Sequence, residues 1–242
     1  MAALKPHQRL LVALDTDDVK RARALARDLK GLVGGVKLGK EFFTANGPQG
    51  VKKVAAAGLP VFLDLKFHDI PNTVAQAVRS ATALAPFMVN VHAAGGEAML
   101  RAAAKAARAA ARLFKVKRPL VLGVTVLTSL SENDLAATGV AADTVLAQVL
   151  RLARLTKDCG LDGVVCSARE VAALRETMGP TFKLVVPGIR PAWASADDQK
   201  RIVTPAEAVT RGADYLVIGR PITGANDPVA AAQRIVAEIK AG

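Results

Sequence analysis

The stretch Val61–Thr73, "VFLDLKFHDIPNT", carries the strongest fold signal in this sequence of 242 residues. It starts as an apolar run typical of a buried β-strand, then places Asp64, Lys66, His68 and Asp69 within six positions. Charges at the end of an apolar strand are costly to bury unless they are paired with one another. In parallel barrels, catalytic groups come from the carboxyl ends of the strands and from the loops that follow. The stretch therefore predicts a strand that ends in a polar site.

The same pattern of short apolar runs and Ala-rich helical stretches continues along the chain. Eight runs bounded by Gly, Pro or Asp are expected to be strands: Leu10–Asp15, Gly35–Gly39, Val61–Lys66, Phe87–Ala93, Leu120–Leu127, Gly163–Ser167, Lys183–Gly188 and Tyr215–Gly219. Near-continuous apolar strands indicate burial on both faces, as in parallel sheets covered by helices. The sequence thus predicts an α/β fold, a parallel eight-stranded (β/α)8 TIM barrel with outer helices, as a single domain over residues 1–242.

Helices are expected between these strands. The first should lie within Thr16–Gly31, capped by Thr16 or Asp17, and others within Gly47–Gly58, Ala98–Phe114 and Asp227–Lys240. An open doubly wound sheet is the alternative fold. The stretch "LDTDDV" after the first strand lacks the G-x-G-x-x-G turn of dinucleotide-binding folds, which disfavours that alternative.

Composition narrows the class of protein. The chain is 51% hydrophobic, yet no uncharged apolar run reaches the roughly 18 residues that a membrane span needs. The first residues, "MAALKPHQRL", lack the long apolar segment of a signal peptide. Cys159 and Cys166 lie in apolar contexts, which favours two buried thiols over a disulfide or a metal site. We therefore expect a cytoplasmic protein that contains no metal.

The formal net charge of +12 raises the question of an anionic partner. The basic residues are scattered along the expected helices, and aromatic residues make up only 4% of the chain, so no base-stacking surface is indicated. We expect a solvated basic surface, with no specific nucleic acid and no membrane as partner.

Charged side chains stand where the expected strands stop: Asp15, Lys37, Asp64, Lys66, Asp69 and His92. Because side chains alternate along a strand, Asp64 and Lys66 are expected to share the face at the barrel mouth, with Phe62 and Leu65 on others. Lys37 should reach the same mouth from the neighbouring strand. In such a Lys–Asp–Lys–Asp cluster the carboxylates are anions, and a charged lysine can donate a proton to a forming carbanion. A purely structural salt-bridge network is the alternative.

The motif "DLKFHDIPNT" resembles the D-x-K-x-x-D-I-P-x-T signature of the orotidine 5′-phosphate decarboxylase family. "ALD", "VKLG", "VLTS", "PGIRP", "DDQ" and "YLVIGRPIT" follow the family order from one end of the chain to the other. The resemblance implies a (β/α)8 homodimer of the compact bacterial type, without a cofactor. It also implies conversion of orotidine 5′-monophosphate to UMP and CO2, the last step of de novo UMP synthesis.

The resemblance also implies roles for the charged residues. Lys66 would protonate C6 as CO2 leaves, and Asp64 would hold Lys66 and press against the substrate carboxylate. Lys37 would bind a ribose hydroxyl and tie the Asp pair together, and Asp15 would bind ribose too. Asp69, a catalytic residue, would be contributed with Thr73 to the site of the neighbouring subunit.

The remaining substrate contacts implied by the resemblance are Ile70 and Asn72 in the signature, Thr128 at the pyrimidine, Arg190, Gly219 and Arg220 at the phosphate, and Gln199 between phosphate and base. Barrels often bind phosphate with the loops after strands seven and eight, which agrees with the last four positions. The stretch Gly188–Thr204 is long for a barrel loop and is a candidate lid.

Two rival functions remain open. The Mg2+-dependent branch of the superfamily, the hexulose-phosphate synthase type, acts on sugar phosphates and uses a glutamate on strand two where this chain has Lys37. That branch also shows a glycine where this signature continues "IPNT". A non-catalytic barrel that binds nucleotides or RNA is the second rival, and the intact Lys66 and Asp64 argue against it.

Overall fold

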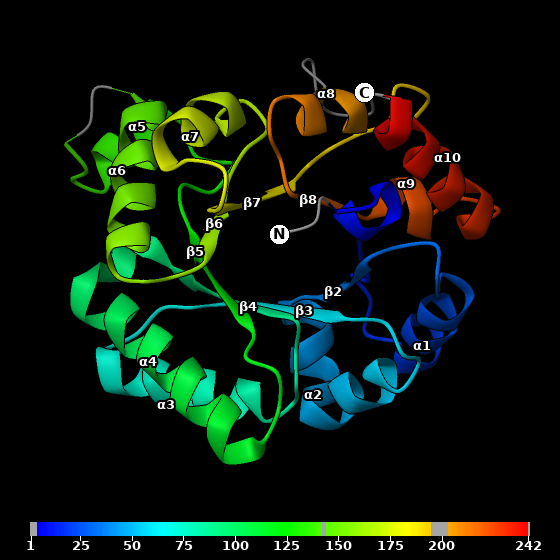
Figure 1. Cartoon of the computed structure of the whole chain (residues 1–242), viewed down its shortest axis with the longest axis horizontal. Helices are drawn as coiled ribbons and strands as arrows, with labels where there is room; N and C mark the ends of the chain where they lie inside the picture. Colours follow the sequence, from blue (N-terminus) through cyan, green and yellow to red (C-terminus); the bar gives the residue numbers. More distant parts are fainter. Residues whose placement is uncertain (1–3, 142–143, 195–202, 242) are drawn as a thin grey trace.

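The computed structural model describes residues 4–141, 144–194 and 203–241. Eight parallel strands form a closed barrel in chain order, and β1 pairs with both β2 and β8 (Figure 1). The strands are β1 Leu10–Ala13, β2 Gly35–Leu38, β3 Val61–Phe67, β4 Met88–His92, β5 Leu120–Val124, β6 Gly163–Val165, β7 Lys183–Pro187 and β8 Tyr215–Ile218. The predicted (β/α)8 barrel is confirmed.

Helices surround the barrel on its outside (Figure 1). They are α1 Val19–Asp28, α2 Lys40–Ala55, α3 Pro71–Thr82, α4 Gly96–Phe114, α5 Glu132–Ala137, α6 Val145–Asp158, α7 Val171–Met178, α8 Pro205–Thr210, α9 Arg220–Thr223 and α10 Pro228–Ala241, with short 3-10 turns η1 Pro6–Arg9 and η2 Ala93–Gly95. In the described part of the chain, none of these helices combines the length and the apolar character needed to cross a membrane.

One predicted helix cap is wrong, and one helical segment is additional to the prediction. The cap of α1 is Asp18, not Thr16 or Asp17, because the Asp18 carboxylate accepts hydrogen bonds from the Lys20 and Arg21 N–H groups at 2.7 and 3.2 Å. α2 consists of two helical segments that meet at Gly47, whose backbone is not helical, so the helix predicted within Gly47–Gly58 corresponds to the second segment, and the first segment, from Lys40, has no counterpart in the prediction. Gly47, with φ of 57°, interrupts α2 and explains why the sequence pattern appears to begin there.

Apolar side chains form two layers. The larger layer lies between the strands and the helices, and a smaller one fills the barrel with Leu11, Ala13, Phe62, Met88, Leu122, Val185, Tyr215 and Val217. The expectation that Phe62 lies on a different face from Asp64 is wrong, since both line one cavity inside the barrel. Alternation along β3 places them together, two residues apart.

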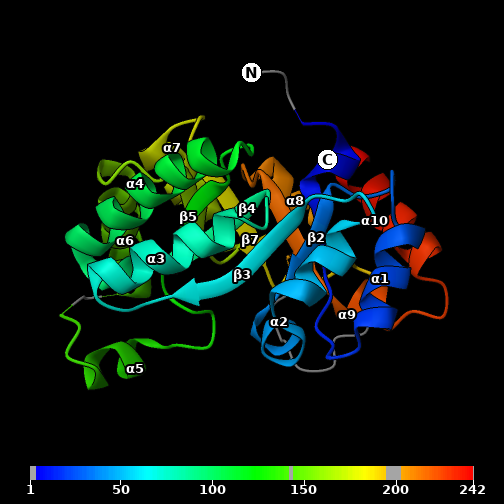
Figure 2. The ribbon, with the colours of Figure 1, turned by 90° about the horizontal axis from the view of Figure 1, so that it is seen from below.

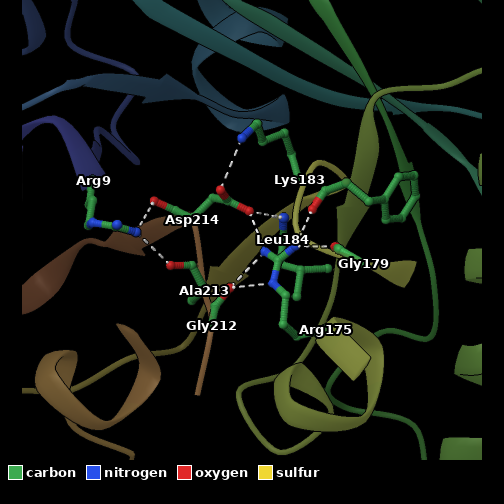
Figure 3. A network of polar contacts seen from close by, with 9 residues as sticks. Arg9, Arg175, Gly179, Lys183, Leu184, Gly212, Ala213 and Asp214 are labelled. Carbon is green, nitrogen blue, oxygen red and sulfur yellow. Dashed lines mark hydrogen bonds and ion pairs between the residues drawn. The ribbon is translucent and has the colours of Figure 1, made fainter. Parts of the chain in front are cut away.

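Charged side chains close the end of the barrel where the strands begin. The Arg175 guanidinium, on α7, donates to Asp214 Oδ2 at 2.6 Å and to the carbonyls of Gly179, Phe182 and Gly212 (Figure 3). Asp214 precedes β8 and also accepts from the Leu184 N–H at 2.9 Å. These groups satisfy one another at the start of β7 and β8, so we assign this network to stability.

Candidate active site

β3 is the strand that carries the most charge to the barrel mouth. Its pairing with β4 is irregular, because Leu63 opposes Val89 while Phe67 opposes Val91. Two extra residues of β3 are therefore accommodated between these pairs, and Lys66 has a left-handed φ of 51°. The distortion lies at the predicted site, where β-bulges often redirect a side chain. The β3 arrow points toward the side of the molecule where α5 lies (Figure 2).

Four predicted residues meet at this mouth as a chain of ion pairs. Lys66 Nζ lies 2.6 Å from Asp64 Oδ1, and Lys37 Nζ lies 3.5 Å from Asp64 Oδ2. Lys37 Nζ also lies 2.9 Å from Asp15 Oδ1. The Asp64 side chain is 11% exposed and that of Asp15 is 58% exposed. The array therefore runs from the barrel interior to its rim.

Asp64 is a carboxylate at neutral pH. Burial alone would raise its pKa, but the charges of Lys37 and Lys66 and hydrogen bonds from Lys66 and Asn90 outweigh burial, so the pKa lies below the usual value. Asp64 is thus a stable anion that pairs with Lys37 and Lys66, in agreement with the sequence interpretation. It is unsuited to donate a proton.

Asn90, in the middle of β4, is a site residue that the sequence interpretation missed. Its Nδ2 donates to Asp64 Oδ1 at 2.7 Å, and its Oδ1 accepts from the Lys66 N–H at 2.8 Å. A polar residue inside an apolar strand was the available signal. Its partners lie 24 and 26 residues away along the chain, so the sequence alone does not identify them.

A cavity of about 260 Å³ opens beside the array. Lys37, Asp64 and Lys66 line one part of it, and predominantly apolar side chains line the rest: Phe62, Val124, Val126, Leu127, Thr128, Ser129, Val165, Cys166, Pro187 and Val217. A larger hollow of about 810 Å³ adjoins it and shares Leu127, Thr128, Ser129 and Pro187 with it. Thr128 therefore borders both spaces. Such a cavity suits a flat, partly apolar ring held against a charged edge.

The expected phosphate residues flank the mouth after β7 and β8. Arg190 is half-buried in the loop after β7, where its N–H donates to the Val203 carbonyl. Gly219 caps α9, and a Cβ added to it would lie 3.9 Å from Asp15 Oδ2. Arg220 is exposed at the start of α9. Gln199 lies outside the described residues, as does the central part of the candidate lid, residues 195–202.

The second half of the signature does not join the array within this chain. Asp69, Ile70, Asn72 and Thr73 are exposed, and Ile70 is 67% exposed. The Asp69 carboxylate accepts a hydrogen bond from the Ile70 N–H at 2.6 Å. Of the described residues, those that line the cavity of the array do not include these four. Their placement at an exposed edge leaves them available to another molecule.

His92 ends β4 near the array. Its ring lies 5.5 Å from that of His68, and burial together with the positive charges of His68, Lys40 and Lys66 lowers the pKa of His92 to about 4. His92 is therefore neutral at pH 7. In the described ranges, His, Cys, Asp and Glu side chains do not gather in groups of three or more that could hold a metal ion.

A closed parallel barrel with ion-paired lysines and carboxylates at the carboxyl ends of its strands defines an enzyme of the TIM-barrel class. Residues 8–235 match the Orotidine 5'-phosphate decarboxylase / HUMPS family. The chain belongs to this family, which confirms the resemblance of its signature.

Named relatives are close in sequence and in structure. The chain is 58% identical to the orotidine 5'-phosphate decarboxylase of Rhodospirillum rubrum, over 95% of this chain and 93% of the relative. It is 55% identical to that of Paramagnetospirillum magneticum, over 94% and 97%. The crystal structure of orotidine 5'-phosphate decarboxylase from Lactobacillus acidophilus superposes with a TM-score of 0.82 at 37% identity, covering 95% of this chain and 97% of that one.

Proposed function

We propose that this protein decarboxylates orotidine 5′-monophosphate to UMP and CO2, the last step of UMP biosynthesis. The observation that supports this most directly is the Lys37–Asp64–Lys66 array beside a cavity of about 260 Å³. The identity of 58% to a named decarboxylase over nearly the whole chain agrees with it. The carboxy-lyase reaction needs a cation at the reacting carbon, and Lys66 supplies one.

In the proposed mechanism the bond between C6 and the carboxylate breaks, and its electron pair stays on C6. A proton moves from Lys66 Nζ to C6, CO2 leaves, and the neutral lysine regains a proton from solvent. Asp64 holds Lys66 Nζ at 2.6 Å and so keeps the proton donor in place. The array is held together by contacts among its own members and Asn90, so little reorganisation is needed when negative charge develops on C6.

Groups away from C6 would add binding energy. Lys37 and Asp15 are proposed to bind the ribose hydroxyls, and Thr128 to contact the pyrimidine. Arg190, Gly219 and Arg220 are proposed to hold the phosphate, and Gln199 to bridge phosphate and base. Phosphate contacts remote from the reacting carbon can lower the barrier when they are used to position the substrate. The reaction requires stabilisation near the upper end of the enzymatic range, about 20 kcal/mol.

We also propose that the protein acts as a homodimer, in which Asp69 and Thr73 reach the neighbouring site, and that Ile70 and Asn72 beside them contact the substrate. The exposure of these four residues supports this, because in one chain they lie apart from the cavity lining. A large exposed apolar side chain such as Ile70 is also typical of an interface.

The cytoplasm is the proposed location, and residues 1–242 are proposed to act as one domain. The two cysteines, Cys159 and Cys166, are free and buried, as is common in reducing compartments.

A Mg2+-dependent sugar-phosphate reaction remains the second candidate, because the matched family covers more than the decarboxylases. An octahedral Mg2+ site uses free oxygen ligands. Here Asp64 is occupied by two lysines and Asn90, and Asp15 by Lys37, which favours the decarboxylase.

The test follows the ultraviolet absorbance of orotidine 5′-monophosphate with purified protein in excess EDTA. We expect conversion by the wild type and a loss of at least about 1000-fold in kcat for Lys66→Ala, since the proton donor is removed. Lys105→Ala, an exposed lysine on α4, serves as the matched control and should retain full activity. Absence of conversion by the wild type, with or without added Mg2+, would contradict the proposed function.

A further inference from the structure

Asn90 is a buried polar residue in the centre of β4, and both ends of its side-chain amide are hydrogen-bonded. It is 0% exposed, between the apolar Val89 and Val91. One end of its amide donates to Asp64, and the other accepts from the backbone of Lys66. Both partners belong to the two residues on which the proposed chemistry depends.

We propose that Asn90 is a positioning residue for decarboxylation, which fixes the Lys66 ammonium and the Asp64 carboxylate in their reactive arrangement. The inference rests on the proposed function and deepens it. Asn90 is not among the described residues that line the cavity, so it acts through Lys66 and Asp64 and not through the substrate.

The first step of the argument concerns the backbone of Lys66. Its φ of 51° lies in the left-handed region, which is unfavourable for a non-glycine residue and persists only where the surroundings impose it. Between the Leu63–Val89 and Phe67–Val91 pairs, regular strand pairing is lost. The side-chain Oδ1 of Asn90 accepts a hydrogen bond from the Lys66 N–H at 2.8 Å and so takes the place of a backbone partner in the strand. Asn90 thereby stabilises the conformation that sets the direction of the Lys66 side chain.

The second step concerns the Asp64 carboxylate. Lys66 Nζ and Asn90 Nδ2 both donate to Oδ1, at 2.6 and 2.7 Å, while Lys37 Nζ lies 3.5 Å from Oδ2. With donors on both oxygens, rotation of the carboxylate would break at least one contact. The amide of Asn90 is neutral, so it adds a hydrogen bond without competing with the lysines for charge. Asn90 thus fixes the plane of the group that holds Lys66.

The test compares Asn90→Ala and Asn90→Asp with the wild type in steady-state decarboxylation. Asn90→Ala removes both contacts and should lower kcat roughly 10- to 100-fold, with KM changed less than about threefold, because substrate contacts remain. Asn90→Asp keeps an acceptor for the Lys66 N–H and places a second carboxylate beside Asp64. Like charges disfavour ionisation, so the acidic limb of its kcat profile should move to higher pH.

Thr82→Val is the matched control. Thr82 is also 0% exposed, and its hydroxyl donates to the Val78 carbonyl within α3 at 2.7 Å. Its loss should lower thermal stability but leave kcat and the pH profile unchanged. All kinetics are measured well below the melting temperature of each variant, as judged by circular dichroism.

Wild-type kcat in folded Asn90→Ala, or a loss that appears only in KM, would overturn the inference while leaving the proposed function intact. If Asn90→Ala does not fold, an unshifted acidic limb in Asn90→Asp overturns it. A wild type that does not convert the substrate removes the proposed function itself, and the inference falls with it.

Discussion

His92 lies near the array, and its shifted pKa makes the free energy of unfolding depend on pH. Its pKa is lowered to about 4 by burial and by the neighbouring positive charges, against 6.5 for an ordinary histidine. Between these two values the unfolded chain binds a proton that the folded chain does not. The free energy of unfolding therefore decreases as pH falls from about 6.5 toward 4, and this contribution is constant above and below that window.

We expect His92→Gln to remove this acid-dependent loss, about 1–2 kcal/mol at pH ~5 after allowance for the partial exposure of the ring. Chemical denaturation of both proteins at pH ~7.5 and ~5 measures it. At the higher pH both side chains are neutral, so the difference there reports packing alone and serves as the control. An unchanged difference between the two pH values would show that His92 does not govern the acid response.

Single residues differ in how well the sequence predicts them. Lys37, Asp64 and Lys66 stand at strand ends, where charge is conspicuous, and the structure brings them together. Asn90 could not be assigned, because its role depends on the irregular register between β3 and β4. The contacts of Asn90 depend on how β3 and β4 pair, and the alternation of side chains within one strand does not predict that pairing.

At the scale of elements, α7 and β8 are joined by Arg175 at the end of the barrel where the strands begin. Its side chain is 22% exposed and contacts Asp214 and three carbonyls (Figure 3). Arg175→Met would leave Asp214 half-buried with a lost partner and three carbonyls with fewer donors. We expect the free energy of unfolding to fall by about 2–4 kcal/mol, as measured by urea denaturation. The kcat should stay at the wild-type value, because the network lies at the end opposite the catalytic array.

Arg101→Met is the control for that prediction. Arg101 pairs with Glu97 one turn earlier on α4, and the two side chains are 54% and 62% exposed. Solvent screens such a pair, so its loss should not change stability measurably. Equal effects of the two substitutions would contradict a stabilising role specific to Arg175.

The strands were predictable to within a few residues, and the largest difference has a physical cause. β5 ends at Val124, whereas the apolar run continues to Leu127. Val126 and Leu127 leave the sheet and line the cavity instead of pairing with a neighbouring strand. Apolar character alone does not distinguish these two environments. The part of α2 before Gly47 could not be predicted, because Gly47 interrupts the helical pattern of the sequence.

For the whole molecule, the two ends of the barrel use charge differently. At one end, Arg118 pairs with Asp162 through two contacts of 2.8 and 2.7 Å, and Asp214 pairs with both Arg175 and Lys183, so these charges satisfy one another. At the other end, Lys37, Asp64 and Lys66 border a cavity that a ligand can enter. The net charge of +12 exceeds what one anionic substrate requires, and it gives the protein a basic surface.

The proposed dimer predicts that two inactive variants can restore activity to each other in a mixed dimer. Lys66→Ala and Asp69→Ala should each be nearly inactive as homodimers, because every site lacks one group. In a mixed dimer, one site combines Lys66 of one chain with Asp69 of the other and is intact. Random exchange of equal amounts should therefore restore about one quarter of wild-type activity, since half the dimers are mixed and each has one intact site.

Mixing Lys66→Ala with Asp64→Ala is the matched control, because both residues belong to the site of their own chain and no combination restores it. Affinity tags of two kinds on the two variants confirm that mixed dimers have formed, and sedimentation gives the oligomeric state. A monomer in sedimentation would exclude the shared site. Verified mixed dimers without recovered activity would place the function of Asp69 within its own chain or outside catalysis, and the exposure of residues 69–73 would then need a different partner.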